Sequence, residues 1–214
     1  MVDFEEARKA FAEKYGCVGK RIRDSDALFF AVGHAYRDVM LRTVPGHGDL
    51  DKGDLDQIKH DLAQAFARYF TEPAPKSGEE FGVIHKKLCS DAFLIPWNNL
   101  LAKHGIEPQN YGKAQKIVNM TFKYLACYDD AADYADWFTF CHMPIDTGTF
   151  NIQKILSGIK LDTSWSNLSE SEYYSFQRTI EQWLSAQTAQ PGMRKLSNSP
   201  LKADFIIWHE AGHI

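Results

Sequence analysis

Apolar residues recur at helical spacing along almost the whole chain, and this feature limits the possible folds more than any other. Positions three or four apart lie on the same face of an α-helix, so such a run predicts a helix with one buried side. The opening residues show the pattern in Phe4, Ala7, Phe11 and Tyr15, and residues 55–69 repeat it. The alternating pattern typical of strands is scarce. The sequence therefore predicts an all-α fold.

Breaks in this pattern divide the chain into predicted helices. Proline and glycine mark most of the breaks, because proline lacks the amide hydrogen that a helix needs and glycine readily ends helices. Pro96 falls inside the fourth helix and predicts a bend there. Pro73-Ala74-Pro75 is the best candidate linker, so we expect helical subdomains at 1–75 and 76–214. The predicted helices cover residues 3–15, 25–41, 54–72, 78–104, 112–128, 146–158, 169–187 and 200–212.

Charge is distributed unevenly along a chain whose formal net charge is −4. This net charge argues against binding of nucleic acid through bulk electrostatic attraction, although a local basic patch is compatible with it. Residues 82–123 provide such a patch, with six lysines against two acidic residues. Residues 124–146 then contain five aspartates and no lysine or arginine. A basic surface beside a catalytic carboxylate would suit DNA chemistry, and solvated helix faces are the ordinary alternative.

The chain shows no signal for a membrane or for export. No apolar run approaches the ~20 residues of a membrane span, and the acidic N-terminus does not resemble a secretory signal. The four cysteines form no CxxC pair, which indicates reduced thiols rather than a disulfide framework. We therefore expect no membrane partner and a cytoplasmic location, associated with the nucleoid if the source is prokaryotic.

The segment from Gly112 to Leu125 carries the first candidate for catalysis. A helix that begins near Gly112 places Lys113 in its first turn and Lys116 one turn later, among apolar side chains. A lysine beside an apolar wall loses hydration, which lowers its pKa and leaves more free amine to attack a carbon atom. A lysine that extends its ammonium group into water is the ordinary alternative. Lys116 is thus the first candidate nucleophile, and Lys113 is the second.

Two aspartates in later segments are candidate partners. Asp146 comes thirty residues after the candidate nucleophile, follows Pro144 and stands where a helix is predicted to begin. A carboxylate at this position is either an ordinary helix cap or an ionised group that points into a cleft. Asp204 and Trp208 are four residues apart, so they share one face of the last helix. An acidic acceptor beside an indole ring can stack a flat heterocycle and accept its N–H groups, although a core tryptophan beside an exposed aspartate is common.

In order and spacing, these three segments resemble the helix-hairpin-helix DNA glycosylases, and most closely the archaeal-type 8-oxoguanine glycosylases. In that family a Gln-Lys sequence carries the Schiff-base lysine, and Gln115-Lys116 matches it. A Pro-Val/Ile-Asp turn carries the catalytic aspartate, and Pro144-Ile145-Asp146 matches it. A Pro-Leu-x-x-Asp-x-x-x-Trp helix lines the base pocket, and Pro200-Leu201, Asp204 and Trp208 match it.

The resemblance covers roughly residues 105–210 and departs from the wider superfamily at the hairpin. A Gly-x-Gly hairpin, whose backbone amides bind a DNA phosphate, is absent, and only Tyr111-Gly112-Lys113 precedes the lysine helix. Archaeal-type members also have an atypical hairpin, so this departure favours that branch. The stretch between Asp146 and Asp204 is longer than the family leads us to expect.

The resemblance implies two helical subdomains with a cleft between them, and a DNA glycosylase with associated AP lyase activity. A monomeric enzyme without metal or cofactor would flip a modified base, 8-oxoguanine as first choice, out of duplex or single-stranded DNA. Lys116 would attack the sugar with the help of Asp146. Asp204 and Trp208 would hold the base, with Trp97 or Phe93 as further stacking partners. The lysines expected to contact DNA phosphates are Lys86, Lys87, Lys113 and Lys123.

Two other functions stay open on the sequence alone. His209-Glu210-Ala211-Gly212-His213 is an HExxH sequence, in which two histidines one helical turn apart bind zinc and the glutamate is the general base of a metallohydrolase. We expect no metal here, because the sequence given ends at Ile214 and leaves no room for a third ligand. The second alternative is a non-catalytic helical module that binds DNA or protein. For His142 we expect a solvent-exposed loop position, with support of Asp146 as the other interpretation.

Overall fold

The computed structural model describes residues 2–44, 47–147, 163–187 and 197–212, and within these ranges the regular structure is entirely helical. The predicted all-α fold is confirmed. Its α-helices are α1 (Phe4–Tyr15), α2 (Ser25–Thr43), α3 (Lys52–Thr71), α4 (Gly78–Cys89), α5 (Ile95–Lys103), α6 (Tyr111–Leu125), α7 (Ala135–Phe138), α9 (Glu170–Gln187) and α10 (Pro200–Glu210). Short 3₁₀ turns add η1 (His47–Asp49), η3 (Ala131–Tyr134) and η4 (Trp165–Asn167). None of the described helices is long and apolar enough to span a membrane.

Side chains just outside the helices explain where several of them begin. The carboxylate of Asp3 accepts a hydrogen bond from the Glu6 amide at 2.9 Å, which caps α1. In α3 the cap is Asp51, three residues before the predicted start at Asp54, because its carboxylate accepts the amides of Gly53 and Asp54. The helix predicted over 146–158 lies outside the described residues beyond Thr147.

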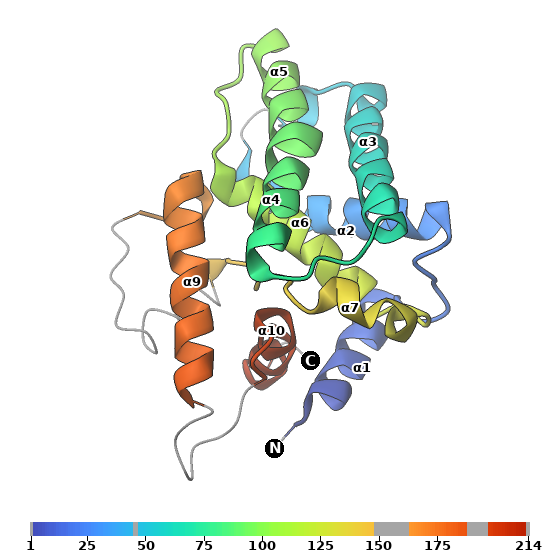
Figure 1. The fold of residues 1–214 in the computed structure, drawn as a ribbon. Helices are drawn as coiled ribbons and strands as arrows, with labels where there is room; N and C mark the ends of the chain where they lie inside the picture. The colour runs from blue at the N-terminus through green and yellow to red at the C-terminus, as the bar shows by residue number, and fades with distance from the viewer. Residues whose placement is uncertain (1, 45–46, 148–162, 188–196, 213–214) are drawn as a thin grey trace.

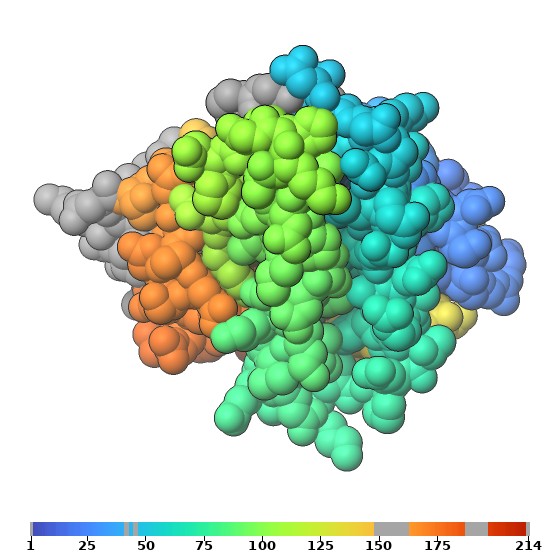
Figure 2. All heavy atoms as spheres, turned by 90° about the horizontal axis from the view of Figure 1, so that it is seen from above, coloured from blue at the N-terminus to red at the C-terminus, as the bar shows by residue number. Residues whose placement is uncertain are grey.

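The predicted break near Pro96 is present as a change of helix type. A π-helical turn, η2 (Ser90–Leu94), joins α4 to α5 directly before this proline. Hydrogen bonds in a π turn span five residues instead of the four of an α-helix. This change of spacing accommodates Pro96, which has no amide hydrogen to donate. The two helices follow each other in one column, with α3 on one side and α9 on the other (Figure 1). Seen from above, α3 and this column lie side by side at the surface (Figure 2).

Helix α6 lies at the centre of the fold and positions the candidate site. It packs against α2, α4, α9 and η4, which enclose it on nearly every side. Thirteen of its fifteen residues are buried, and the two that are partly exposed are Lys116 and Met120. These two residues are four apart, so they lie on one face. The candidate nucleophile therefore stands on the single open stripe of a helix that is otherwise core.

The buried side chains form one cluster that draws on both predicted subdomains. The ring of Phe11 in α1 lies 5.4 Å, between centroids, from that of Tyr124 in α6 and also from that of Phe205 in α10. All four cysteines are buried and free. The two-subdomain arrangement with a cleft stays a prediction.

Candidate functional site

The structure brings together Lys116 of α6 and Asp146, which follows the irregular segment 139–145. The Lys116 Nζ atom lies 3.3 Å from the Asp146 Oδ2 atom, and the two side chains are 13% and 33% exposed. A pair with this exposure is close to solvent yet partly desolvated, which is the environment a reactive amine needs. Lys116 and Asp146 are thirty residues apart in the sequence, and the fold brings their side chains into direct contact.

A tryptophan that the sequence analysis did not single out covers this pair. The Lys116 Nζ atom lies 4.9 Å from the centre of the Trp165 ring, within cation–π distance. The indole N–H of Trp165 donates to the Thr147 hydroxyl at 3.0 Å, so the ring is also tied to the residue after Asp146. An isolated tryptophan between predicted helices carries no spacing signal, and only the fold shows that it belongs to the site.

A close backbone approach holds η4, and with it Trp165, against the start of α6. The Gly112 amide donates to the Leu168 carbonyl oxygen at 2.9 Å. A Cβ atom at Gly112 would lie only 2.1 Å from the Trp165 carbonyl oxygen, so a larger residue does not fit. The resemblance to the glycosylases implies that this glycine belongs to an atypical DNA-binding hairpin. The structure shows a packing reason for a glycine here, because the absent side chain lets the turn η4 approach α6.

A second lysine–aspartate pair lies deeper, two helical turns along α6. The Lys123 Nζ atom donates to the Asp204 Oδ2 atom at 2.6 Å, and the side chains are only 2% and 4% exposed. Residues seven apart lie nearly in line on a helix, about 10 Å apart along its axis. Asp204 belongs to α10 and shares one face with Trp208, as predicted. The Lys123 ammonium also lies 4.6 Å from the Phe11 ring centre and 5.5 Å from that of Trp208.

The electrostatics of Asp204 link the two pairs. Burial raises the pKa of the Asp204 carboxyl, while the charge and hydrogen bond of Lys123 oppose the increase. The Asp146 carboxylate also raises this pKa, and Lys116 lowers it. The four charged groups are therefore close enough to act on one another, although their side chains come from three separate segments of the chain.

Two of the four predicted phosphate contacts are buried. Lys113 donates its ammonium hydrogens to the Thr43 carbonyl oxygen at 2.7 Å and to the Gln109 side-chain oxygen, and burial lowers its pKa. Lys123 is engaged by Asp204, as described above. Neither ammonium group faces solvent, which corrects the expectation that both contact DNA phosphates. Lys86 and Lys87 are exposed on α4, and Lys86 pairs with Glu170 at 2.7 Å.

Expectations for three further residues need correction. Trp97 and Phe93 are fully buried against each other and beside Tyr36, so neither ring is open to stack on a base. His142 is buried rather than solvent-exposed, and its Nδ1 atom lies 2.8 Å from the Tyr173 hydroxyl oxygen. Burial and the neighbouring His85 hold the pKa of His142 well below its ordinary value.

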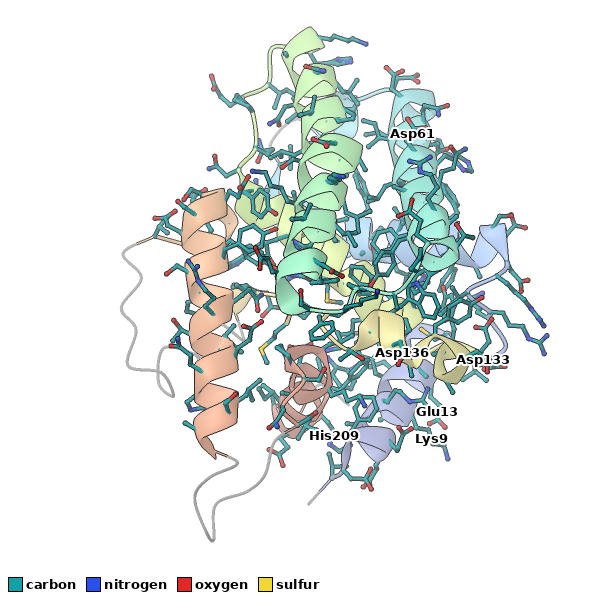
Figure 3. All side chains as sticks on the ribbon, viewed as in Figure 1. Lys9, Glu13, Asp61, Asp133, Asp136 and His209 are labelled. Atoms are coloured by element: carbon teal, nitrogen blue, oxygen red, sulfur yellow. The ribbon has the colours of Figure 1, made fainter. Side chains whose placement is uncertain are left out.

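The terminal HExxH sequence does not lie within one continuous helix. Helix α10 ends at Glu210, and Gly212 has a left-handed φ of 74°, so the helix that carries His209 is interrupted before His213. His209 is labelled near the end of α10 in Figure 3, and His213 lies outside the described residues. Within the described residues, no three histidine, cysteine or acidic side chains are grouped as metal ligands.

Comparison of the chain with protein-family models, with curated proteins and with solved structures found no match.

Proposed function

We propose that the chain is a DNA glycosylase with AP lyase activity, in which Lys116 is the nucleophile and Asp146 its partner. The observation that carries the proposal is the 3.3 Å approach of these two side chains on the open stripe of α6. A primary amine beside a carboxylate is the pair that displacement at a sugar carbon requires, because the amine must lose a proton before it attacks. The resemblance of the three sequence segments to the glycosylases supports the same assignment.

In the proposed reaction the Lys116 ammonium group first gives a proton to Asp146 or to water. The free amine then attacks C1′ of the flipped nucleotide, the C1′–N bond breaks, and the base leaves with the bonding electrons and takes up a proton. Ring opening of the sugar gives an iminium ion between Nζ and C1′. Loss of a C2′ proton then expels the 3′ phosphate and cuts the strand, and water hydrolyses the iminium to regenerate Lys116. When water takes the first proton, the Asp146 carboxylate, 3.3 Å away, stays ionised and stabilises positive charge at the sugar during base departure.

The second pair supplies groups that suit recognition of a base. Lys123 offers hydrogen-bond donors and Asp204 offers acceptors, within an aromatic wall that includes Phe11 and Trp208. An oxidised purine such as 8-oxoguanine has both N–H donors and carbonyl acceptors on a flat ring. We assign Asp204 and the half-buried ring of Trp208 to the base pocket, where the bond between Asp204 and Lys123 must open before a base can enter, and 8-oxoguanine is the first substrate to test.

The exposed lysines of α4 suit sequence-independent contact with the backbone of DNA. Lys86 and Lys87 are adjacent and face solvent, and phosphate contacts of this kind fix the position of a duplex without reading its sequence. With a net charge of −4, such contacts give weak binding that falls steeply with salt. We propose a monomer that binds one modified nucleotide in duplex or single-stranded DNA.

The test is borohydride trapping on a panel of duplexes and single strands, each with one modified base. The wild-type protein should form a covalent adduct with at least one of them and release its base. Lys116→Gln should bind the same DNA and form no adduct, because an amide cannot form the iminium ion. Lys103→Gln, a change at an exposed lysine of α5, is the charge-matched control and should trap like the wild type.

The outcomes separate the alternatives. Normal trapping by Lys116→Gln would refute its assignment as nucleophile, and loss of trapping in Lys113→Gln instead would transfer the role to that lysine. Specific binding without base release on any member of the panel would favour the non-catalytic module.

A further inference from the structure

The position of Asp146 is set by a buried segment without regular secondary structure. Every residue from Cys141 to Ile145 is buried, and the described part of the chain shows no helix across these five positions. A backbone of this kind must find its hydrogen bonds outside the helical ladder. The groups that form hydrogen bonds with this backbone therefore determine the position of the Asp146 carboxylate.

Gln115, the residue before the nucleophile, holds Ile145, the residue before the carboxylate. The Gln115 Nε2 atom donates to the Ile145 carbonyl oxygen at 2.9 Å, and the Gln115 Oε1 atom accepts from the Ile145 amide at 3.3 Å. One side chain thus binds both backbone groups of a single residue. Such a two-point contact fixes the orientation of the backbone as well as its distance, in the way that neighbouring strands fix each other.

The amide of Gln115 is fully engaged and therefore held in one orientation. Its second N–H donates to the Gly112 carbonyl oxygen at 2.8 Å, and its oxygen also accepts from the Asn119 side chain at 3.1 Å. Two donors and two acceptor positions are all that a glutamine amide possesses. Since the side chain is 0% exposed, water cannot replace any of these bonds, and rotation of the amide would break them together.

Helix α9 also forms hydrogen bonds with the segment from Cys141 to Ile145. The Gln177 Nε2 atom donates to the Met143 carbonyl oxygen at 2.7 Å. The Tyr173 hydroxyl oxygen accepts from Asn119 at 2.8 Å and lies 2.8 Å from His142, so it connects α6, α9 and the segment. Two helices thus support the backbone on which Asp146 stands.

We propose that Gln115 is a positioning residue, which aligns Asp146 with Lys116 by holding Ile145, and that Gln177 supports this role from α9. The inference rests on the proposed function. Neither glutamine touches the reacting atoms, since both act through backbone groups of residues 143–145. Their contribution is to the rate of the chemical step, because displacement of a catalytic group by 1 Å costs about 100-fold in rate.

The test compares Gln115→Met, Gln177→Met and the control Thr121→Val by single-turnover base release well below the melting temperature of each variant. Methionine has nearly the length of glutamine and lacks its hydrogen bonds. Thr121 is also a buried polar residue of α6, but its hydroxyl donates within the helix, to the Ile117 carbonyl oxygen at 2.8 Å. The rate constant reports alignment, and the reaction amplitude reports the fraction of folded enzyme, so the two effects are measured separately.

We expect Gln115→Met to lower the rate constant about 100-fold and Gln177→Met about tenfold, with an apparent Kd for DNA within about twofold of the wild type. Thr121→Val should keep the wild-type rate constant. If Gln115→Met does not fold, Gln177→Met decides. Wild-type rate constants in the folded glutamine variants would overturn this inference alone. A wild-type protein that releases no base would overturn the proposed function, and this inference with it.

Discussion

Acidification from pH 7 to pH 5 should destabilise the protein, because two buried histidines are held neutral in the folded state. Burial lowers the pKa of His85 from 6.5 to about 3, although a hydrogen bond from the ring to Asn119 opposes the decrease. Burial and His85 also lower the pKa of His142. The unfolded chain titrates these rings near pH 6.5, so below that pH it takes up protons that the folded protein excludes. The free energy of unfolding therefore keeps its full value above pH 6.5 and falls as the pH decreases toward 3.

For His85 alone the decrease amounts to about 2 kcal/mol at pH 5, since each pH unit below 6.5 contributes about 1.36 kcal/mol. His85 is 0% exposed, so solvent does not screen the effect. The side chains hydrogen-bonded to its ring carry no charge that would stabilise a protonated ring, and they are those of Cys89, Tyr111, Asn119, Tyr173 and Tyr174. Urea denaturation at pH 7, 6 and 5 measures the free energy directly.

The variant His85→Gln separates this effect from the titration of other groups. It should be less stable than the wild type at pH 7, because it loses hydrogen bonds to Asn119 or Tyr174. It should also lose about 2 kcal/mol less than the wild type between pH 7 and pH 5. His104→Gln, at an exposed histidine, is the matched control and should keep the wild-type pH dependence. Equal pH dependence in His85→Gln and the wild type would refute the reasoning.

Two further changes test the contacts around α6. Gly112→Ala should destabilise the fold by about 1–3 kcal/mol, because its Cβ atom would meet the Trp165 carbonyl oxygen at 2.1 Å; an unchanged melting temperature would contradict the close approach. Asp204→Asn should cost about 3–5 kcal/mol, because it leaves the Lys123 ammonium group buried without a counter-charge. The double variant Lys123→Met with Asp204→Leu should recover most of that loss in thermal unfolding, and no recovery would show that the pair itself stabilises the fold.

The helical periodicity and the proline positions were sufficient to predict most of the fold. Apolar spacing repeats locally, so it predicted α1, α3 and α9 to within two residues of their observed bounds. The change of helix type next to Pro96 also has a local cause. The pairing of Lys116 with Asp146, which the resemblance implied, is present in the structure as a contact at 3.3 Å.

The burial of Lys113 and Lys123 had no signal in the sequence. Most polar residues of α6, including all three lysines, share one side of the helix, and a polar side of this kind normally faces water. Here their partners, Thr43 and Asp204, are seventy and eighty-one residues away along the chain. Local patterns do not encode such distant pairings, so a lysine that is paired in the core and one that faces solvent look the same. For the same reason, the position of Trp165 beside Lys116 could not be predicted from the sequence.

The enclosure of α6 would tie the proposed activity to the stability of the fold. Because neighbouring elements pack around thirteen of fifteen residues, a change of side-chain volume at most positions of α6 is transmitted to the placement of Lys116. Selection for the proposed reaction and selection for the fold would therefore act on the same positions of this helix. Lys86 and Lys87 lie on the surface of α4, outside this enclosure, so substitutions there would change the proposed affinity for DNA while the core stays unchanged.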